Sequence, residues 1–140
     1  MAGATRARFE RAYLATTYRL FAGNERLDLR IGARAPALDR LLHASGMRNW
    51  AFVTACNPGS RPLPAWRNRA RQLRLWRSLT GMRLRLPGLG VPDASGWKPE
   101  PSVLVAPVPP GRARRIARRF GQNAVVAGRR GAAPALVWSD

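Results

Sequence analysis

The sequence is poor in cysteine, histidine and acidic residues. Its 140 residues include one cysteine, Cys56, and one histidine, His43. This is too few for an internal disulfide or a Cys/His zinc site, so we predict no metal and no other cofactor. Chains without a disulfide framework are typical of a reducing compartment, and we expect a cytoplasmic location.

Long apolar runs are also lacking. No stretch approaches the roughly 20 apolar residues that cross a bilayer, and the N-terminus lacks the basic, apolar and small-residue succession of a signal peptide. We therefore expect neither a membrane span nor a membrane partner. At 140 residues the chain fits one domain, 1–140. Its apolar residues fall into short blocks typical of buried strands: Ala51–Val53, Val103–Val105 and Ala124–Val126.

The charge is strongly one-sided. Only 7 acidic residues oppose 25 basic ones, which gives a formal net charge of +18. All the basic residues except Lys98 are arginines. Such a charge attracts nucleic acid, anionic surfaces and acidic proteins. The abundance of Ala, Gly, Pro and Arg is also typical of GC-rich codons, so part of the charge reflects composition rather than function.

Apolar periodicity predicts four helices and about five strands. The helices are expected at 6–18, 36–45, 65–79 and 111–120. The strands are expected at 27–31, 50–56, 103–105, 123–127 and 135–138, with a weaker pattern at 83–86 and a Gly/Pro loop over 87–96. The alternation indicates an α/β (α+β mixed) fold with a small mixed β-sheet flanked by helices. Strand order and oligomeric state do not follow from the pattern.

Polar residues follow the apolar strand at 50–56. Asn57 and Ser60 lie in a loop that leads to the next helix, and free N–H groups there could hold an anion such as phosphate or carboxylate. The loop lacks the glycine patterns of phosphate-binding and dinucleotide-binding motifs. Alternatively, Asn57, Pro58 and Gly59 only make a turn. Cys56 is interpreted as a small core residue rather than a thiolate nucleophile.

Two other polar segments lie beside predicted strands. Gln122 and Asn123 follow the last helix, where their amides either read the hydrogen-bonding edge of a ligand or satisfy loose backbone groups. Glu100, in the segment Trp97–Ser102, is the best single candidate for a catalytic acid or base. The sequence shows no catalytic triad and no carboxylate pair, so it does not say whether the protein is an enzyme.

Arginines on two helices suggest an alternative, nucleic-acid binding. They occur among residues 67–77 and on the outer face of the helix at 111–120, as Arg112, Arg114, Arg115, Arg118 and Arg119. They could track phosphates, although a solvated helix face has the same pattern. Trp50, Trp66, Trp76 and Trp138 fit core positions, so base stacking on them is not expected.

Several segments together resemble a known family. They are 29–32 (LRIG), 51–60 (AFVTACNPGS), Asn68 with Leu75, Trp97 with Glu100 and Ser102, and 120–126 (FGQNAVV). In this order, from Tyr13 to Trp138, they resemble the bacterial domain of unknown function 3293 (DUF3293) family. The resemblance implies a small stand-alone protein and supplies no activity, substrate or cofactor. The chain departs from the family's pattern at Arg67, where members often carry Glu.

Three hypotheses follow. The first is a pocket for a small anionic ligand, such as a nucleotide, at the strand ends. Its lining residues would be Asn57, Ser60, Asn68, Glu100, Gln122 and Asn123. The second is a basic protein that binds RNA or DNA through its arginines. The third is a protein–protein interaction module, favoured if no cavity forms.

Overall fold

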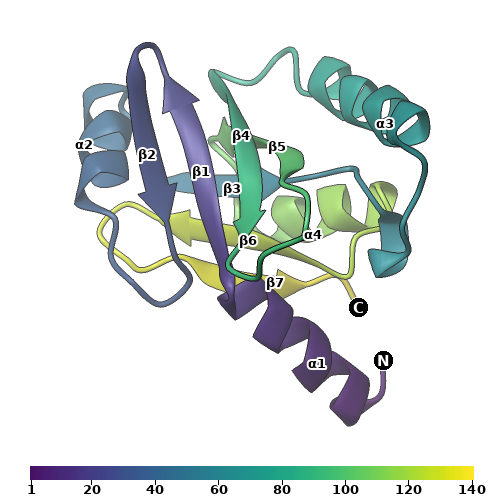
Figure 1. The fold of residues 1–140 in the computed structure, drawn as a ribbon. Helices are drawn as coiled ribbons and strands as arrows, with labels where there is room; N and C mark the ends of the chain where they lie inside the picture. Colours follow the sequence, from purple (N-terminus) through teal and green to yellow (C-terminus); the bar gives the residue numbers. More distant parts are fainter.

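The computed structural model describes residues 1–140 and contains a single seven-stranded sheet with four α-helices (Figure 1). The helices are α1 (Gly3–Leu14), α2 (Pro36–Ala44), α3 (Ala65–Ser78) and α4 (Pro110–Arg119). The strands are β1 (Thr16–Ala22), β2 (Glu25–Leu29), β3 (Asn49–Val53), β4 (Leu84–Pro92), β5 (Glu100–Ala106), β6 (Ala124–Arg129) and β7 (Ala135–Trp138).

The strands are arranged in the order β2-β1-β4-β5-β3-β6-β7. Every neighbouring pair is antiparallel. The mixed α/β class is confirmed. The expectation of a mixed sheet of about five strands is wrong in two respects, because the sheet has seven strands and no parallel neighbours. The sheet is curled, so its two faces are convex and concave.

The helix expected at 6–18 ends early, at Leu14. Residues 16–22 form strand β1, which pairs with β2 across the two-residue turn Gly23-Asn24. Gly23 has φ of 61°, which suits the first position of a tight hairpin turn. The buried residues Tyr18 and Leu20 alternate with partly exposed neighbours, which is the period of a strand.

Strand β4 runs through the segment 87–92, where a Gly/Pro loop was expected. The reason is a contact across the sheet, because Gly88 is packed under the ring of Phe52 of β3. A Cβ at Gly88 would lie 2.7 Å from Phe52 Cε2 and 2.7 Å from the carbonyl oxygen of Arg19. Here glycine allows the close approach of a backbone and an aromatic ring rather than a turn.

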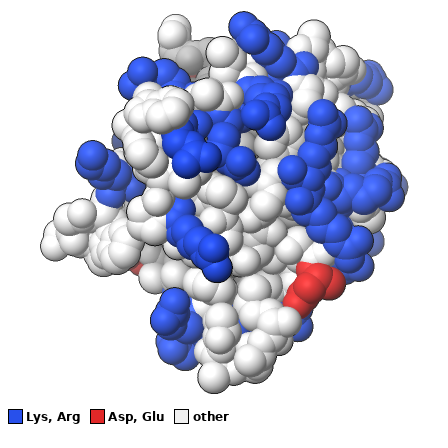
Figure 2. All heavy atoms as spheres, turned by 90° about the vertical axis from the view of Figure 1, so that its right-hand side faces the viewer, with Lys and Arg blue, Asp and Glu red and all other residues white.

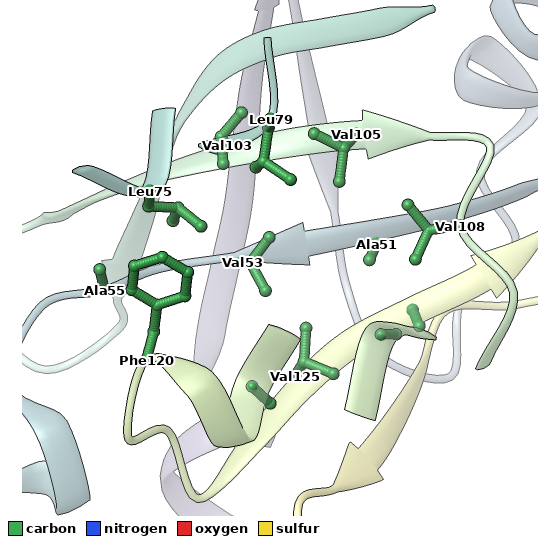
Figure 3. Close-up of a cluster of buried hydrophobic side chains, with 13 residues drawn as sticks. Ala51, Val53, Ala55, Leu75, Leu79, Val103, Val105, Val108, Phe120 and Val125 are labelled. Carbon is green, nitrogen blue, oxygen red and sulfur yellow. The ribbon is translucent and has the colours of Figure 1, made fainter. Parts of the chain in front are cut away.

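Helices α3 and α4 cover the convex face of the sheet. Figure 3 shows the core between them, with Val53 of β3, Val103 of β5 and Val125 of β6 facing Leu75 of α3 and Phe120 at the end of α4. All five side chains are buried. Burying a valine or leucine side chain contributes roughly 1.5–3 kcal/mol, so this layer fixes both helices on the sheet.

The inward face of α3 differs in part from the one that apolar periodicity predicts, which carries Trp66, Ala70, Leu73, Trp76 and Leu79. Trp66 and Leu73 are 67% and 46% exposed, whereas Leu75 and Leu79 are buried. The expected core positions of Trp66 and Leu73 are therefore wrong, whereas Leu79 is buried and Trp76 packs against the core as expected. The partly buried side of α3 carries polar residues instead, among them Asn68, which positions them beside the end of β3.

The concave face holds the second core cluster. Leu38 and Leu42 of α2 pack there with Trp50 of β3 and Leu20 of β1. Tyr18 and Phe52 extend this cluster toward one end of the sheet, near α1. None of the helices has the length and apolar character that a bilayer crossing requires.

Candidate functional site

A cavity of about 280 Å³ opens at the end of the concave face. Its walls come from α1, from β1 and β4, from the end of β3 with the loop after it, and from the first residues of β5 and β6. These segments lie far apart in sequence. The curl of the sheet brings them to one rim.

Strand register places Glu100 in the lining of the cavity, in one row with Gly90 and Tyr18. Glu100 pairs with Gly90 across β5 and β4, and Gly90 pairs with Tyr18 across β4 and β1. Directly opposite residues in antiparallel strands point to the same face, so the three residues form one row. Gly90 contributes no side chain, and this leaves space between Tyr18 and Glu100.

Two asparagines join the loop after β3 to α3. Asn57 donates its backbone N–H to Asn68 Oδ1 at 2.9 Å, and Asn68 Nδ2 donates to Asn57 Oδ1 at 2.7 Å. Asn57 Oδ1 also accepts from the backbone N–H of Leu63 at 3.0 Å. Asn57 has φ of 47°, a left-handed conformation that asparagine tolerates better than most residues. The pair therefore fixes the loop against the helix.

The same network holds Glu100. Asn57 Nδ2 donates to Glu100 Oε2 at 3.0 Å, whereas Glu100 Oε1 accepts no well-aligned hydrogen bond, because the nearby Thr54 hydroxyl donates to the carbonyl oxygen of Pro101 at 2.8 Å. Burial raises the pKa of the Glu100 carboxyl, and the polar side chains of Asn57 and Thr54 beside it oppose this only in part. The cavity thus contains one carboxyl group that is positioned through one oxygen and free at the other.

Two tyrosines and a phenylalanine form the apolar wall beside Glu100. Tyr18 and Phe52 meet edge to face, with ring centroids 5.4 Å apart. Tyr18 donates its hydroxyl to the carbonyl oxygen of Tyr13 at 2.8 Å, and burial raises the pKa of Tyr13 to about 12. Burial also raises the pKa of Tyr18, so both phenols stay protonated near neutral pH and this wall of the cavity carries no charge.

The loop at 55–61 has no free N–H group for an anion. Gly59 donates to Gly121, and Ser60 donates to Asn57 within the short 3-10 turn Pro58–Ser60. The remaining N–H groups, those of Ala55, Cys56, Asn57 and Arg61, are also hydrogen-bonded. The interpretation of this segment as a turn is confirmed. An anion would have to be bound by other groups.

The two amides after α4 hold loops in place. Gln122 Nε2 donates to the carbonyl oxygens of Cys56 and Phe120 at 3.0 and 3.3 Å. This confirms the interpretation that Gln122 satisfies loose backbone groups. Asn123 Nδ2 donates to Ser60 Oγ at 3.0 Å, which joins the start of β6 to the 3-10 turn. Gln122 and Ser60 line the cavity, whereas Asn68 and Asn123 lie outside the lining and support it.

Cys56 and Lys98 are two further lining residues. Cys56 is 2% exposed, as expected for a core residue, and burial raises the pKa of its thiol, which disfavours a nucleophilic thiolate. Lys98 is the only basic residue of the lining. It follows Trp97, which is 71% exposed, in the loop between β4 and β5.

Sequence reasoning missed the aromatic wall. Tyr13 and Tyr18 were assigned to one helix, although they lie on α1 and β1 and face the same cavity. A usable signal existed in the run Thr16-Thr17-Tyr18, which is rich in strand formers, and in the two-residue turn Gly23-Asn24 after it. Gly90 gave no signal, because its role depends on neighbours across the sheet.

The arginines of α4 are divided between two roles. Arg114 Nε donates to the carbonyl oxygen of Trp138 at 3.1 Å, and Arg118 Nε donates to that of Ser139, so both tie α4 to the C-terminal segment. The side chains of Arg112, Arg115 and Arg119 make no hydrogen bond or ion pair and are exposed. None of the five lies at the cavity.

Comparison with known proteins yields one match. A family model described as "Protein of unknown function (DUF3293)" matches residues 53–125, just over half of the chain. No curated protein and no solved structure matches significantly. The matched region contains Asn57, Asn68, Glu100 and Gln122, and it ends at the first residues of β6.

Proposed function

Since the chain belongs to the DUF3293 family, whose description assigns no activity, we propose from its geometry that the cavity binds a small organic molecule. The ligand presents an N–H donor edge or an amine to Glu100 and places its apolar body against the aromatic wall of Tyr13, Tyr18 and Phe52. The observation that carries this proposal is the Glu100 carboxyl in the cavity lining, which accepts a hydrogen bond from Asn57 at Oε2 and none at Oε1.

The chemistry of the carboxyl group favours a donor. One oxygen already accepts a hydrogen bond from Asn57 at 3.0 Å, and the apolar surroundings penalise the negative charge. A ligand N–H directed at Oε1 would satisfy the second oxygen, and a cationic amine would also offset the charge. Flat aromatic rings complement the Tyr18 and Phe52 side chains.

The size of the cavity limits the ligand. At about 280 Å³ it lies at the small end of ligand pockets, which span roughly 300–1,000 Å³. The anionic ligand expected from the sequence would meet a carboxyl group and hydrogen-bonded loop N–H groups, with only Lys98 to attract it. A donor-bearing ligand therefore fits better than an anion.

Benzamidine and benzoate test the proposal, because they share a planar ring and differ in the charge and hydrogen-bonding polarity of the head group. At about 10 mM, benzamidine is expected to raise the unfolding temperature, since a ligand present at ten times its Kd stabilises by about 1.4 kcal/mol. Benzoate should leave the temperature unchanged. If benzoate stabilises and benzamidine does not, the ligand class is anionic and the proposal fails.

Two variants and a control locate the binding. Glu100→Gln should abolish the benzamidine shift, because it removes the charge and places an amide in the cavity. Gly90→Val should abolish it by filling the hollow, since a Cβ there meets nothing closer than 3.8 Å and φ is ordinary. The control Glu10→Gln changes an exposed carboxylate on α1 and should keep the full shift. An equal loss in all three would contradict binding at this site.

The buried free thiol of Cys56 is compatible with a reducing compartment. A cytoplasmic location stays a prediction, and localisation of a tagged full-length chain would test it.

A further inference from the structure

The face formed by α3 and α4 carries many basic residues and no acidic residue to neutralise them. Residues 61–92 and 101–139 contain no Asp or Glu, although they carry fifteen arginines. All the ion pairs lie elsewhere and involve the N-terminus, Arg6, Arg19, Arg26 and Arg30. Figure 2, which looks at this side of the molecule, shows many Lys and Arg atoms and few acidic ones. We propose that this face binds single-stranded nucleic acid through its phosphate backbone.

Seven arginines of the face are free to meet phosphates. Their side chains make no hydrogen bond or ion pair within the protein: Arg67, Arg69, Arg74 and Arg77 of α3, and Arg112, Arg115 and Arg119 of α4. The three on α4 follow the spacing i, i+3, i+7 and so lie in one row, about 4.5 and 6 Å apart along the helix axis. Arginine forks pair with phosphate oxygens in bidentate fashion.

The arginines of α3 and α4 are held in fixed positions relative to one another. Arg71 of α3 donates Nε to the carbonyl oxygen of Ala55 and Nη2 to that of Phe120, both at 2.6 Å. It therefore ties the middle of α3 to the end of α4, across the same convex layer. A rigid array of guanidinium groups loses less conformational entropy on binding than a mobile one.

Trp66 indicates a single strand rather than a duplex. It begins the basic face at the first turn of α3 and is 67% exposed. Arg67 and Arg69 follow it within three residues. An exposed indole beside arginines offers a stacking platform for an unpaired base, which is unavailable inside a duplex.

The same face does not suit a bilayer. Interfacial helices insert an apolar side into the lipid, but the apolar side of α4 is turned to the core, where Ala113, Ala117 and Phe120 are buried. Only Trp66 and Leu73 are large exposed hydrophobic residues of α3. The surface thus offers several exposed arginines and an apolar contact at Trp66 and Leu73.

Fluorescence anisotropy with labelled oligonucleotides of about 20 nucleotides tests the inference. Single-stranded RNA and DNA of the same sequence are expected to bind at about 150 mM salt with a Kd on the order of 1–100 µM, and more tightly than the duplex. Comparing the Kd values of the two single strands shows whether the face prefers RNA or DNA. The triple variant Arg112→Gln, Arg115→Gln, Arg119→Gln should reduce the salt dependence of log K by about 2.

Matched variants separate a local face from net charge. Arg11→Gln, Arg40→Gln, Arg48→Gln removes three exposed arginines from other elements and should weaken binding less than the α4 triple. Trp66→Ala should weaken single-strand binding about five- to one-hundredfold and leave duplex binding unchanged.

Four results would overturn the inference. The first is an equal loss of oligonucleotide binding in the two triple variants, and the second is no oligonucleotide binding at about 150 mM salt. The third is displacement of the labelled oligonucleotide by polyglutamate as readily as by an unlabelled oligonucleotide. The fourth is binding to anionic vesicles but not to oligonucleotides. These experiments are independent of the cavity, so Glu100→Gln should bind oligonucleotides like the wild-type protein.

Discussion

Glu100 holds a carboxyl group in an apolar hollow, and this placement couples its proton to folding. Burial raises the pKa of Glu100 in the folded protein above the ordinary value of 4.5. The unfolded chain therefore releases this proton at a lower pH than the folded one. The stability linked to Glu100 is complete below pH 4.5 and decreases as the pH rises through the folded-state pKa.

Glu100→Gln should remove this dependence. The variant keeps an oxygen that can accept from Asn57 Nδ2 but cannot ionise, so its free energy of unfolding should increase relative to wild type between about pH 4 and pH 8. Urea unfolding at several pH values measures the difference. Glu10→Gln, at an exposed site on α1, should show no such trend. If the difference in the free energy of unfolding between Glu100→Gln and wild type does not change with pH, the surroundings do not destabilise the ionised Glu100 carboxylate.

Individual residues differ in how far the sequence predicted them. Asn57, Glu100 and Gln122 were found because polar side chains next to apolar strands are unusual, and the structure places all three in the cavity lining. The separate roles of these three residues do not follow from the sequence, because they depend on hydrogen bonds between segments up to 66 residues apart. Only the structure shows that Gln122 supports the site while Glu100 keeps a free oxygen.

At the scale of elements, the contact between the end of α4 and the 3-10 turn fixes the loop after β3. Gly121 has φ of 69°, and a Cβ there would lie 2.9 Å from Pro58 Cβ. Its carbonyl oxygen also accepts from Gly59 N–H at 2.8 Å. Glycine is thus required both for the backbone conformation and for the close approach.

Gly121→Ala should destabilise the protein by about 1–3 kcal/mol, because alanine is strained at this φ and collides with Pro58. Gly111→Ala is the matched control within α4, since its Cβ would meet only Arg115 Nη1 at 3.8 Å. It should be neutral or stabilising by up to about 1 kcal/mol, as alanine favours the helix. Denaturant unfolding of both variants measures the contrast. Similar effects at the two positions would contradict the packing described here.

The helices were easier to predict than the strands for a physical reason. The periods of α2, α3 and α4 are local properties, and their observed bounds lie within one or two residues of the predicted ones. Strand β4 depends on partners in β1 and β5, and its glycines resemble a loop when considered alone. Strand β1 was hidden because its apolar residues also satisfy a helical period shared with α1.

At the scale of the whole molecule, charge is distributed unevenly. The N-terminal side carries exposed ion pairs, such as Arg30 with Asp93 at 2.8 Å, whereas the α3 and α4 face carries arginines alone. Exposed ion pairs contribute about 0–1 kcal/mol each. The formal net charge of +18 adds a repulsion that no such pair offsets on the basic face.

Moderate salt should therefore stabilise the protein. The screening length shrinks from about 30 Å at 0.01 M to about 8 Å at 0.15 M salt, which weakens repulsion between well-separated arginines more than attraction within close pairs. The unfolding temperature is expected to rise over this range by a few degrees, as measured by circular dichroism in sodium chloride.

Two variants of equal net charge test the origin of this effect. The triple Arg112→Gln, Arg115→Gln, Arg119→Gln removes repulsion and should flatten the salt dependence. The triple Arg6→Gln, Arg19→Gln, Arg30→Gln removes ion-paired arginines instead and should be the less stable of the two at low salt, because it also loses attraction. An unfolding temperature that falls with salt in the wild-type protein would show that attraction in the few ion pairs outweighs repulsion between the arginines. A bound polyanion would then not stabilise the protein by relieving repulsion on the basic face.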